Sequence, residues 1–178
     1  MSFRAILASD QRVPQTSSGR LLTIDEIESP VLLRARACWN ELRGSRRFPA
    51  RSDLTPRVLG ALLPHVLLLK VIDDGANYEF RIVGDIHVQA YGGNFQNKRL
   101  SEIALTYPSF AAGRRILCEG VRMGRDPFGY RGWIGRDMPD TRFVYHESAY
   151  FPLGATDEAV DHVLTVAVYV PRAGGVYD

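Results

Sequence analysis

The tract Val66–Ile72 constrains the fold of this chain more than any other segment, because it is short and apolar almost throughout. Such a tract is typical of a strand that is buried on both faces of a sheet. Turn-forming residues follow at 73–77, and residues 78–83 then alternate between apolar and polar side chains. Together these segments predict a β-hairpin.

Helical and extended patterns flank this hairpin. Ahead of it, apolar residues recur at helical spacing from about Ser29 to Arg43, and residues 55–63 suit a second, short helix. Residues 84–119 show broken helical signals, and the longest helix is expected from about Tyr107 to Glu119. Strands are predicted near residues 65–73, 77–84, 129–135, 142–153 and 160–170. This order favours an α+β fold: a five-stranded antiparallel sheet with helices on one face and an added N-terminal helix.

The length of 178 residues fits one domain with short extensions better than two domains. We expect an N-terminal extension over residues 1–26, a folded domain over 27–172 and a C-terminal tail over 173–178. Residues 9–20 are polar and contain Pro and Gly, which predicts a flexible or loosely docked segment.

Charge and composition argue against several classes of partner. A formal net charge of +2 is too small to indicate a nucleic acid or an anionic membrane. No stretch approaches the roughly 18 apolar residues that span a bilayer, and the first residues do not form a signal peptide. Cys38 and Cys118 lie outside any Cys/His cluster, so no zinc site is expected. Free thiols and a single disulfide between the two cysteines are both alternatives at this point. We expect a cytoplasmic protein.

Three blocks of the sequence combine particular residue types in a distinctive order. They are Trp39–Gly44 with Phe48–Pro56 and Leu62–Val66, then Phe80–Gly84 with Tyr91-Gly92, and finally His146–Leu153 with Val160–Leu164. These blocks resemble a PAS-like domain family found mainly in alphaproteobacteria. The resemblance covers about residues 27–170 and departs from the family at residues 93–99, where an Asp and a Thr-Gly step are usual. It implies the PAS fold and a sensory role in signal transduction. Because the domain uses up the 178 residues, we expect output in trans.

The resemblance also argues against a prosthetic group. Haem-binding PAS domains generally place an axial histidine on the long helix before the third strand, and here that helix carries Cys118 and no histidine. The sequence run of flavin photosensor domains does not occur either. No cofactor is therefore expected.

Enzymatic motifs are missing from the sequence as well. No two of the four histidines have metal-ligand spacing, and no nucleophile elbow is present. The chain is therefore not expected to be an enzyme. A basic run from Arg43 to Arg51 suits phosphate, or else helix capping and pairing with Asp53 or Glu41.

Glu147 is the most informative polar residue, because it falls in the more apolar row of the predicted strand 142–153. A carboxylate on such a face must be paired, hydrogen-bonded or protonated. Two interpretations stay open. Glu147 either anchors a ligand inside a cavity, or it has a structural role, paired with an arginine such as Arg81 or placed at an exposed edge.

These observations predict a cavity between the inner face of the sheet and the helices from Ile86 to Glu119. Its candidate lining residues are Tyr91, Phe110, Ile116, Phe143, Tyr145 and Glu147. We expect a sensory or regulatory module that binds a small ligand or a signalling protein. The alternatives are a structural interaction domain without a ligand and, third, a small enzyme.

The first helix is expected to take part in a homodimer. Strands 66–72 and 160–170 are apolar on both faces, so the sheet needs two covers. The helix can cover part of one face, with Trp39 buried beneath it, and a twofold partner is the economical cover for the rest. The competing explanation is that the helix and the extension cover the whole face of a monomer.

Overall fold

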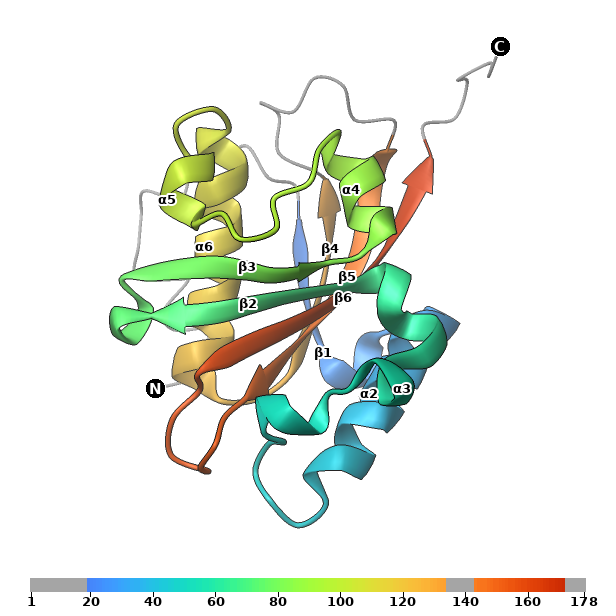
Figure 1. Cartoon of the computed structure of the whole chain (residues 1–178). Coiled ribbons are helices and arrows are strands. Elements are labelled where there is room, and N and C mark those ends of the chain that lie inside the picture. The colour runs from blue at the N-terminus through green and yellow to red at the C-terminus, as the bar shows by residue number, and fades with distance from the viewer. Residues whose placement is uncertain (1–18, 134–142, 172–178) are drawn as a thin grey trace.

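The computed structural model describes residues 19–133 and 143–171, which form one antiparallel sheet with helices on both faces (Figure 1). The strand order across the sheet is β1-β4-β5-β6-β2-β3. The strands are β1 (Arg20–Thr23), β2 (Val66–Ile72), β3 (Asn77–Val83), β4 (Phe128–Trp133), β5 (Phe143–Leu153) and β6 (His162–Pro171). The predicted α+β fold is confirmed, and all five predicted strands occur.

The apolar tract forms an interior strand of the sheet. β2 pairs with β3 through the predicted hairpin and with β6 on its other side, so Leu69 lies opposite both Phe80 and Val163. Residues 66–69 are all buried, whereas Lys70 is exposed. Burial on both faces explains why this strand shows no apolar–polar alternation.

Helices account for most of the remaining described chain. The α-helices are α2 (Pro30–Arg43), α3 (Pro56–Leu59), α4 (Asp85–Tyr91), α5 (Leu100–Ile103) and α6 (Pro108–Gly124), and the 3-10 helices are η1 (Ile24–Glu26), η2 (Arg51–Asp53), η3 (Gly60–His65) and η4 (Asp73–Gly75). Gly44 ends α2 with a φ of 54°, a conformation that favours glycine. Thr55 caps α3, because its hydroxyl accepts a hydrogen bond from the Val58 amide.

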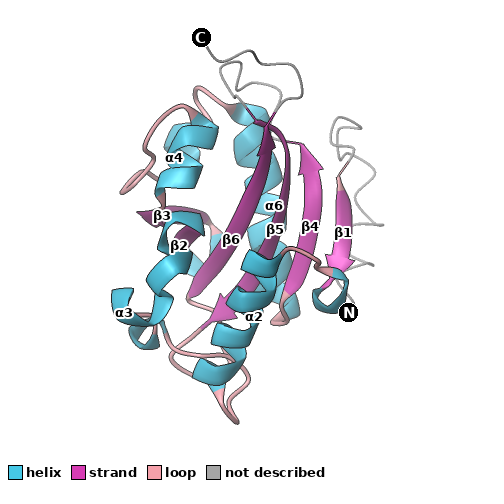
Figure 2. Ribbon diagram, turned by 90° about the vertical axis from the view of Figure 1, so that its right-hand side faces the viewer, coloured by secondary structure: helices cyan, strands magenta, loops and turns pink. Residues whose placement is uncertain are grey.

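The expected placement of the helices is confirmed, because α4, α5 and α6 gather on one face and the added N-terminal helix α2 lies on the other (Figure 2). α2 packs on β5 and β6 from one side, while α6 packs on the same two strands from the other, as Figure 2 shows. α4 and α5 join α6 on that second layer through their contacts with η3, β3 and β6. The physical reason is the one that the sequence offers, since strands that are apolar on both faces need two covers.

α2 is docked through one side. Leu32, Ala35 and Trp39 are its buried residues, and Trp39 is only 5% exposed, which confirms the prediction for this side chain. The Trp39 indole N–H donates to the Pro152 carbonyl at 3.0 Å, and its ring lies 5.8 Å from that of Phe151. The helical spacing in the sequence also places Val31, Cys38 and Leu42 on this side, but the three residues are only half-buried.

The sheet has one strand more than the five expected, because β1 adds a sixth at the edge. β1 pairs with β4, with Leu22 opposite Gly129. Leu22 is buried, and Gly129 leaves room for it, since a Cβ there would lie 3.0 Å from the Leu22 Cβ. Residues 20–23, which belong to the predicted N-terminal extension, thus pair with β4 and form the outer strand of the sheet.

Some sequence predictions fall outside the described residues. They concern residues 9–18 and the tail at 173–178. The tract 93–99, where the sequence departs from the family, lies against β3. There the Phe80 amide donates to the Lys98 carbonyl, and the Asn97 amide donates to the Phe80 carbonyl.

Candidate functional site

Strand β5 presents alternate side chains to the two helical layers. Tyr150 reaches Arg114 of α6, whereas the next residue, Phe151, packs on Trp39 of α2. Between residues 146 and 153, even-numbered side chains therefore face α4 and α6, and odd-numbered side chains face α2. This alternation decides which of the predicted site residues can meet.

Glu147 lies on the α2 side and is paired there. Its carboxylate accepts hydrogen bonds from Arg131 at 3.0 Å and from the backbone amides of Glu28 at 3.1 Å and Ser29 at 3.5 Å. These two amides stand just before α2 begins at Pro30. Glu147 thus ties the start of α2 to β4 and β5, and the arginine that it pairs with is Arg131 instead of Arg81.

A polar cluster lies on the opposite side of β5, centred on Arg114. This side chain is on α6 and is only 6% exposed. Its guanidinium donates to the Tyr150 hydroxyl at 2.8 Å and to the Tyr91 hydroxyl at 2.8 Å. In the described part of the chain, no carboxylate lies within ion-pair distance of Arg114. A buried guanidinium is ordinarily paired with an anion, because burying an uncompensated charge is costly.

The groups around Arg114 are neutral and do not supply that anion. Burial raises the pKa of the Tyr150 and Tyr169 hydroxyls, so both keep their protons. Burial likewise raises the pKa of the Cys118 thiol to about 12. The charge of Arg114 is therefore solvated by hydroxyl dipoles and ring faces, with the Phe110 and Tyr150 centroids 5.6 and 5.7 Å from its Cζ.

The cluster continues from Tyr91 to His87 on α4. His87 Nε2 lies 2.8 Å from the His65 carbonyl oxygen. Since that oxygen can only accept, Nε2 carries the hydrogen of the neutral ring and Nδ1 is the acceptor. The Tyr169 hydroxyl lies 2.8 Å from Nδ1 and 3.2 Å from the Tyr91 hydroxyl. A line of hydrogen bonds therefore links Arg114 to the chain just ahead of β2.

Both histidines beside Arg114 are held in the neutral form. Burial lowers the pKa of His87 to about 3, and the nearby guanidinium of Arg114 contributes in the same direction. Burial and Arg114 also lower the pKa of His146 to about 3. The cluster thus carries one positive charge at neutral pH, that of Arg114.

Three buried polar atoms of this layer lack a hydrogen-bond partner among the described residues. They are Arg114 Nε, His146 Nδ1 and Thr165 Oγ1. Thr165 lies opposite Tyr150 in the β5–β6 pair, so it faces the same layer. Buried polar atoms are nearly always hydrogen-bonded in folded proteins. Each of these three atoms therefore has hydrogen-bonding capacity that the described residues do not use.

Aromatic rings adjoin the polar cluster. The Tyr91 ring centroid lies 4.9 Å from that of Phe110 and 5.6 Å from that of Phe95. Phe95 also lies 6.0 Å from Tyr107. This arrangement places one cationic group beside several aromatic rings, a composition typical of small-molecule sites.

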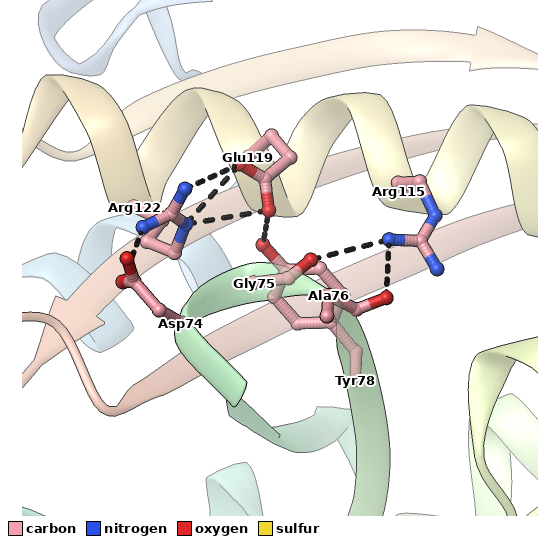
Figure 3. Close-up of polar contacts among 7 residues, drawn as sticks. All are labelled: Asp74, Gly75, Ala76, Tyr78, Arg115, Glu119 and Arg122. Atoms are coloured by element: carbon pink, nitrogen blue, oxygen red, sulfur yellow. Dashed lines mark hydrogen bonds and ion pairs between the residues drawn. The ribbon is translucent and has the colours of Figure 1, made fainter. Parts of the chain in front are cut away.

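The far half of α6 is fixed to the β2–β3 hairpin by a second polar network (Figure 3). Tyr78 donates its hydroxyl hydrogen to Glu119, whose carboxylate also accepts hydrogen bonds from Nε and Nη2 of Arg122. Arg122 also pairs with Asp74 in the turn at 2.8 Å. Arg115, near the middle of α6, donates to the backbone carbonyls of residues 75 and 76. Arg114 is therefore held on a helix anchored close to it.

The six predicted site residues do not form one group. Tyr91 and Phe110 are buried and lie in contact beside Arg114. Ile116 is half-buried on α6, outside the buried stripe of that helix, and Glu147 faces the other layer. For Phe143 and Tyr145 the backbone belongs to β5, and their side chains lie outside the described part of the structure.

The sequence reasoning missed Arg114, although a signal was available. Arg114 stands four residues after Phe110 and four before Cys118, within the apolar stripe of the predicted helix. Like Glu147, a charged residue in an apolar stripe must be paired, hydrogen-bonded or neutralised, which marks it as a candidate site residue. The contact between His87 and Tyr169 had no such signal, because it joins residues that are 82 positions apart.

Other groups considered from the sequence have ordinary roles. The basic run is partly paired, since Arg46 contacts Asp53 and Arg43 donates to the Arg46 carbonyl. Cys38 and Cys118 are free thiols. Across residues 19–133 and 143–171, no three His, Cys, Asp or Glu side chains gather as a metal site would require. Nor does any described helix have the length and apolar character of a transmembrane span.

Comparison with known proteins bears on the fold as a whole. Residues 27–113 match the family model of the PAS domain. No curated protein and no solved structure matches the chain. The matched segment runs from just before α2 into α6 and contains the β2–β3 hairpin, and β4, β5 and β6 complete the five-stranded core beyond it. The match and the topology agree, and together they support a PAS-like domain in this chain.

Proposed function

We propose that this PAS domain is a sensory module that binds a small ligand between its sheet and the α4–α6 layer. The observation that carries the proposal is Arg114, a buried cation without a carboxylate among the described residues. Such a group costs folding free energy, so it is better explained by binding than by stability. Tyr91 and Phe110, two of the residues predicted from the sequence, adjoin it.

The output of the module is proposed to pass to a signalling protein in trans, without catalysis by this domain. The two buried histidines support a non-catalytic role, because a general base needs a pKa near the working pH. Burial lowers the pKa of both His87 and His146 far below that range. A cytoplasmic location belongs to the same proposal.

Native mass spectrometry of the protein purified from its own host tests ligand binding directly. We expect a mass above the 19.9 kDa of the chain under native conditions, which returns to the chain mass on denaturation. An Arg114→Met variant prepared in parallel should lack the excess. A wild-type protein that carries no additional mass would favour the alternative, an interaction domain without a ligand.

The homodimer stays a prediction, now with a different basis. The apolar residues on the α2 side of the sheet, such as Val66, Leu68 and Val166, are already buried within the chain. An open sheet face therefore no longer argues for a partner. Leu33 on α2 is 43% exposed and offers an apolar contact on the proposed helix. Sedimentation at micromolar concentration decides the question, and a single species near 19.9 kDa would rule the dimer out.

A further inference from the structure

We infer that the ligand of this site is a small organic acid whose single carboxylate binds Arg114 and whose apolar body packs on the neighbouring aromatic rings. The inference rests on the proposed sensory function and specifies its ligand class. It starts from the hydrogen-bonding capacity of the guanidinium. A guanidinium has five N–H donors, and in the described structure it donates to the hydroxyls of Tyr91 and Tyr150 while its Nε has no acceptor.

A carboxylate matches what Arg114 lacks. It is planar, acceptor-only and able to take two parallel N–H bonds, which is the geometry that arginine recognises best. It would also compensate the buried positive charge, because the Tyr150, Tyr169 and Cys118 side chains beside Arg114 stay protonated. A neutral ligand would leave that charge uncompensated.

The charge balance distinguishes a carboxylate from a phosphate. The described groups around Arg114 contribute one cation, because both His87 and His146 are buried and neutral. A monoanion is neutralised by this environment, whereas a phosphate dianion would carry an excess negative charge into a buried site. A single ionised carboxylate is therefore the better match.

The aromatic neighbours indicate the rest of the molecule. Phe110 approaches both Arg114 and Tyr91, and Phe95 stacks on Tyr91 with an interplanar angle of 15°. The rings of Phe95 and Phe110 are each 6% exposed, so contact with them removes apolar ligand surface from water. An aromatic or medium-chain aliphatic acid combines the required parts.

Calorimetric titration with paired probes tests the inference. The probes are benzoate, phenylacetate and hexanoate, their uncharged amides, and inorganic phosphate, each at constant ionic strength. We expect at least one acid to bind and its amide to bind about 10- to 100-fold more weakly, as loss of a charge-assisted pair implies. In ¹H–¹⁵N spectra the Nε–H signal of Arg114 should shift on addition of the acid.

Two variants separate the site from its surroundings. Arg114→Met removes the cation with similar side-chain length and should abolish acid binding. Arg115→Met is the matched control, because Arg115 is the next residue on α6 and donates to the hairpin carbonyls of Gly75 and Ala76 instead. It should bind the acid as wild type does. Circular dichroism establishes that each variant is folded, and the acid–amide comparison in wild type needs no variant.

The possible outcomes are distinct from failure of the proposed function. If an amide or phosphate binds as tightly as the acids, the carboxylate class is wrong, although small-ligand binding stands. If no acid binds wild-type protein at millimolar concentration, the inference is overturned, and native mass spectrometry still tests whether any ligand is retained. If a folded Arg114→Met variant binds the acid as tightly as wild type does, Arg114 is not the carboxylate site.

Discussion

His87 and His146 lie buried beside Arg114, and protonating either of them means placing a second positive charge next to the first. Their pKa values of about 3 in the folded protein lie well below the ordinary value of 6.5 in the unfolded chain. The neutral rings therefore stabilise the fold fully above about pH 6.5, and this contribution declines as the pH falls toward the folded pKa.

We predict that the free energy of unfolding drops by about 1.4 kcal/mol per buried histidine between pH 7.5 and pH 5.5. His146→Phe preserves the ring contacts with Tyr130 and Tyr169 and should remove half of this pH dependence. Urea unfolding at a series of pH values measures the slope. His162→Gln is the control, because it retains both buried histidines, and an unchanged slope in His146→Phe would contradict the prediction.

At the scale of the element, α2 shows how a helix is attached through one large side chain. Trp39 is buried against Phe151 and donates to the backbone of β5. We predict that Trp39→Ala destabilises the fold by about 3–5 kcal/mol, because it leaves a cavity and an unpaired Pro152 carbonyl.

Thermal and urea unfolding measure this loss. Leu33→Ala is the matched control on the same helix, since Leu33 is largely on the outer side at 43% exposure and should change stability by less than about 1 kcal/mol. A Trp39→Ala protein that melts with wild type would show that α2 is not held by this residue.

The elements themselves could be predicted from the sequence, because each depends on a local pattern. β2 shows its burial as an unbroken apolar run, and α2 ends where Gly44 permits a positive φ. The site could be predicted only in part. Tyr91 and Phe110 follow from helical spacing, but the face on which Glu147 lies depends on β-sheet register and on α2, which no local pattern fixes. β1 was missed because four residues are too short for a periodic signal.

At the scale of the whole molecule, β1 extends the sheet beyond β4 and becomes its outer strand. The packing of β1 depends on Gly129, because a Cβ there would lie 2.8 Å from the Ile27 side chain and 3.0 Å from the Leu22 Cβ. We predict that Gly129→Ala destabilises the fold by about 1–3 kcal/mol through overpacking.

The contrasting substitution is Gly113→Ala on α6, where an added Cβ would meet nothing within 4 Å. It should stabilise the protein by about 0.4–1 kcal/mol, since alanine restricts the unfolded chain and favours helix. Urea midpoints of the two variants should therefore move in opposite directions. Equal shifts of the same sign would show that β1 is not packed on Gly129 in solution.

The alternation of β5 has a mechanical consequence. His146 belongs to the layer of Arg114, and its neighbour Glu147 holds the amides at the start of α2. The sheet separates the two helical layers, and two consecutive residues of β5 place one side chain in each layer. The two helical layers are consequently linked through β5. A displacement of its backbone at residues 146–147 would move the His146 contacts in one layer and the Glu147 contacts in the other together.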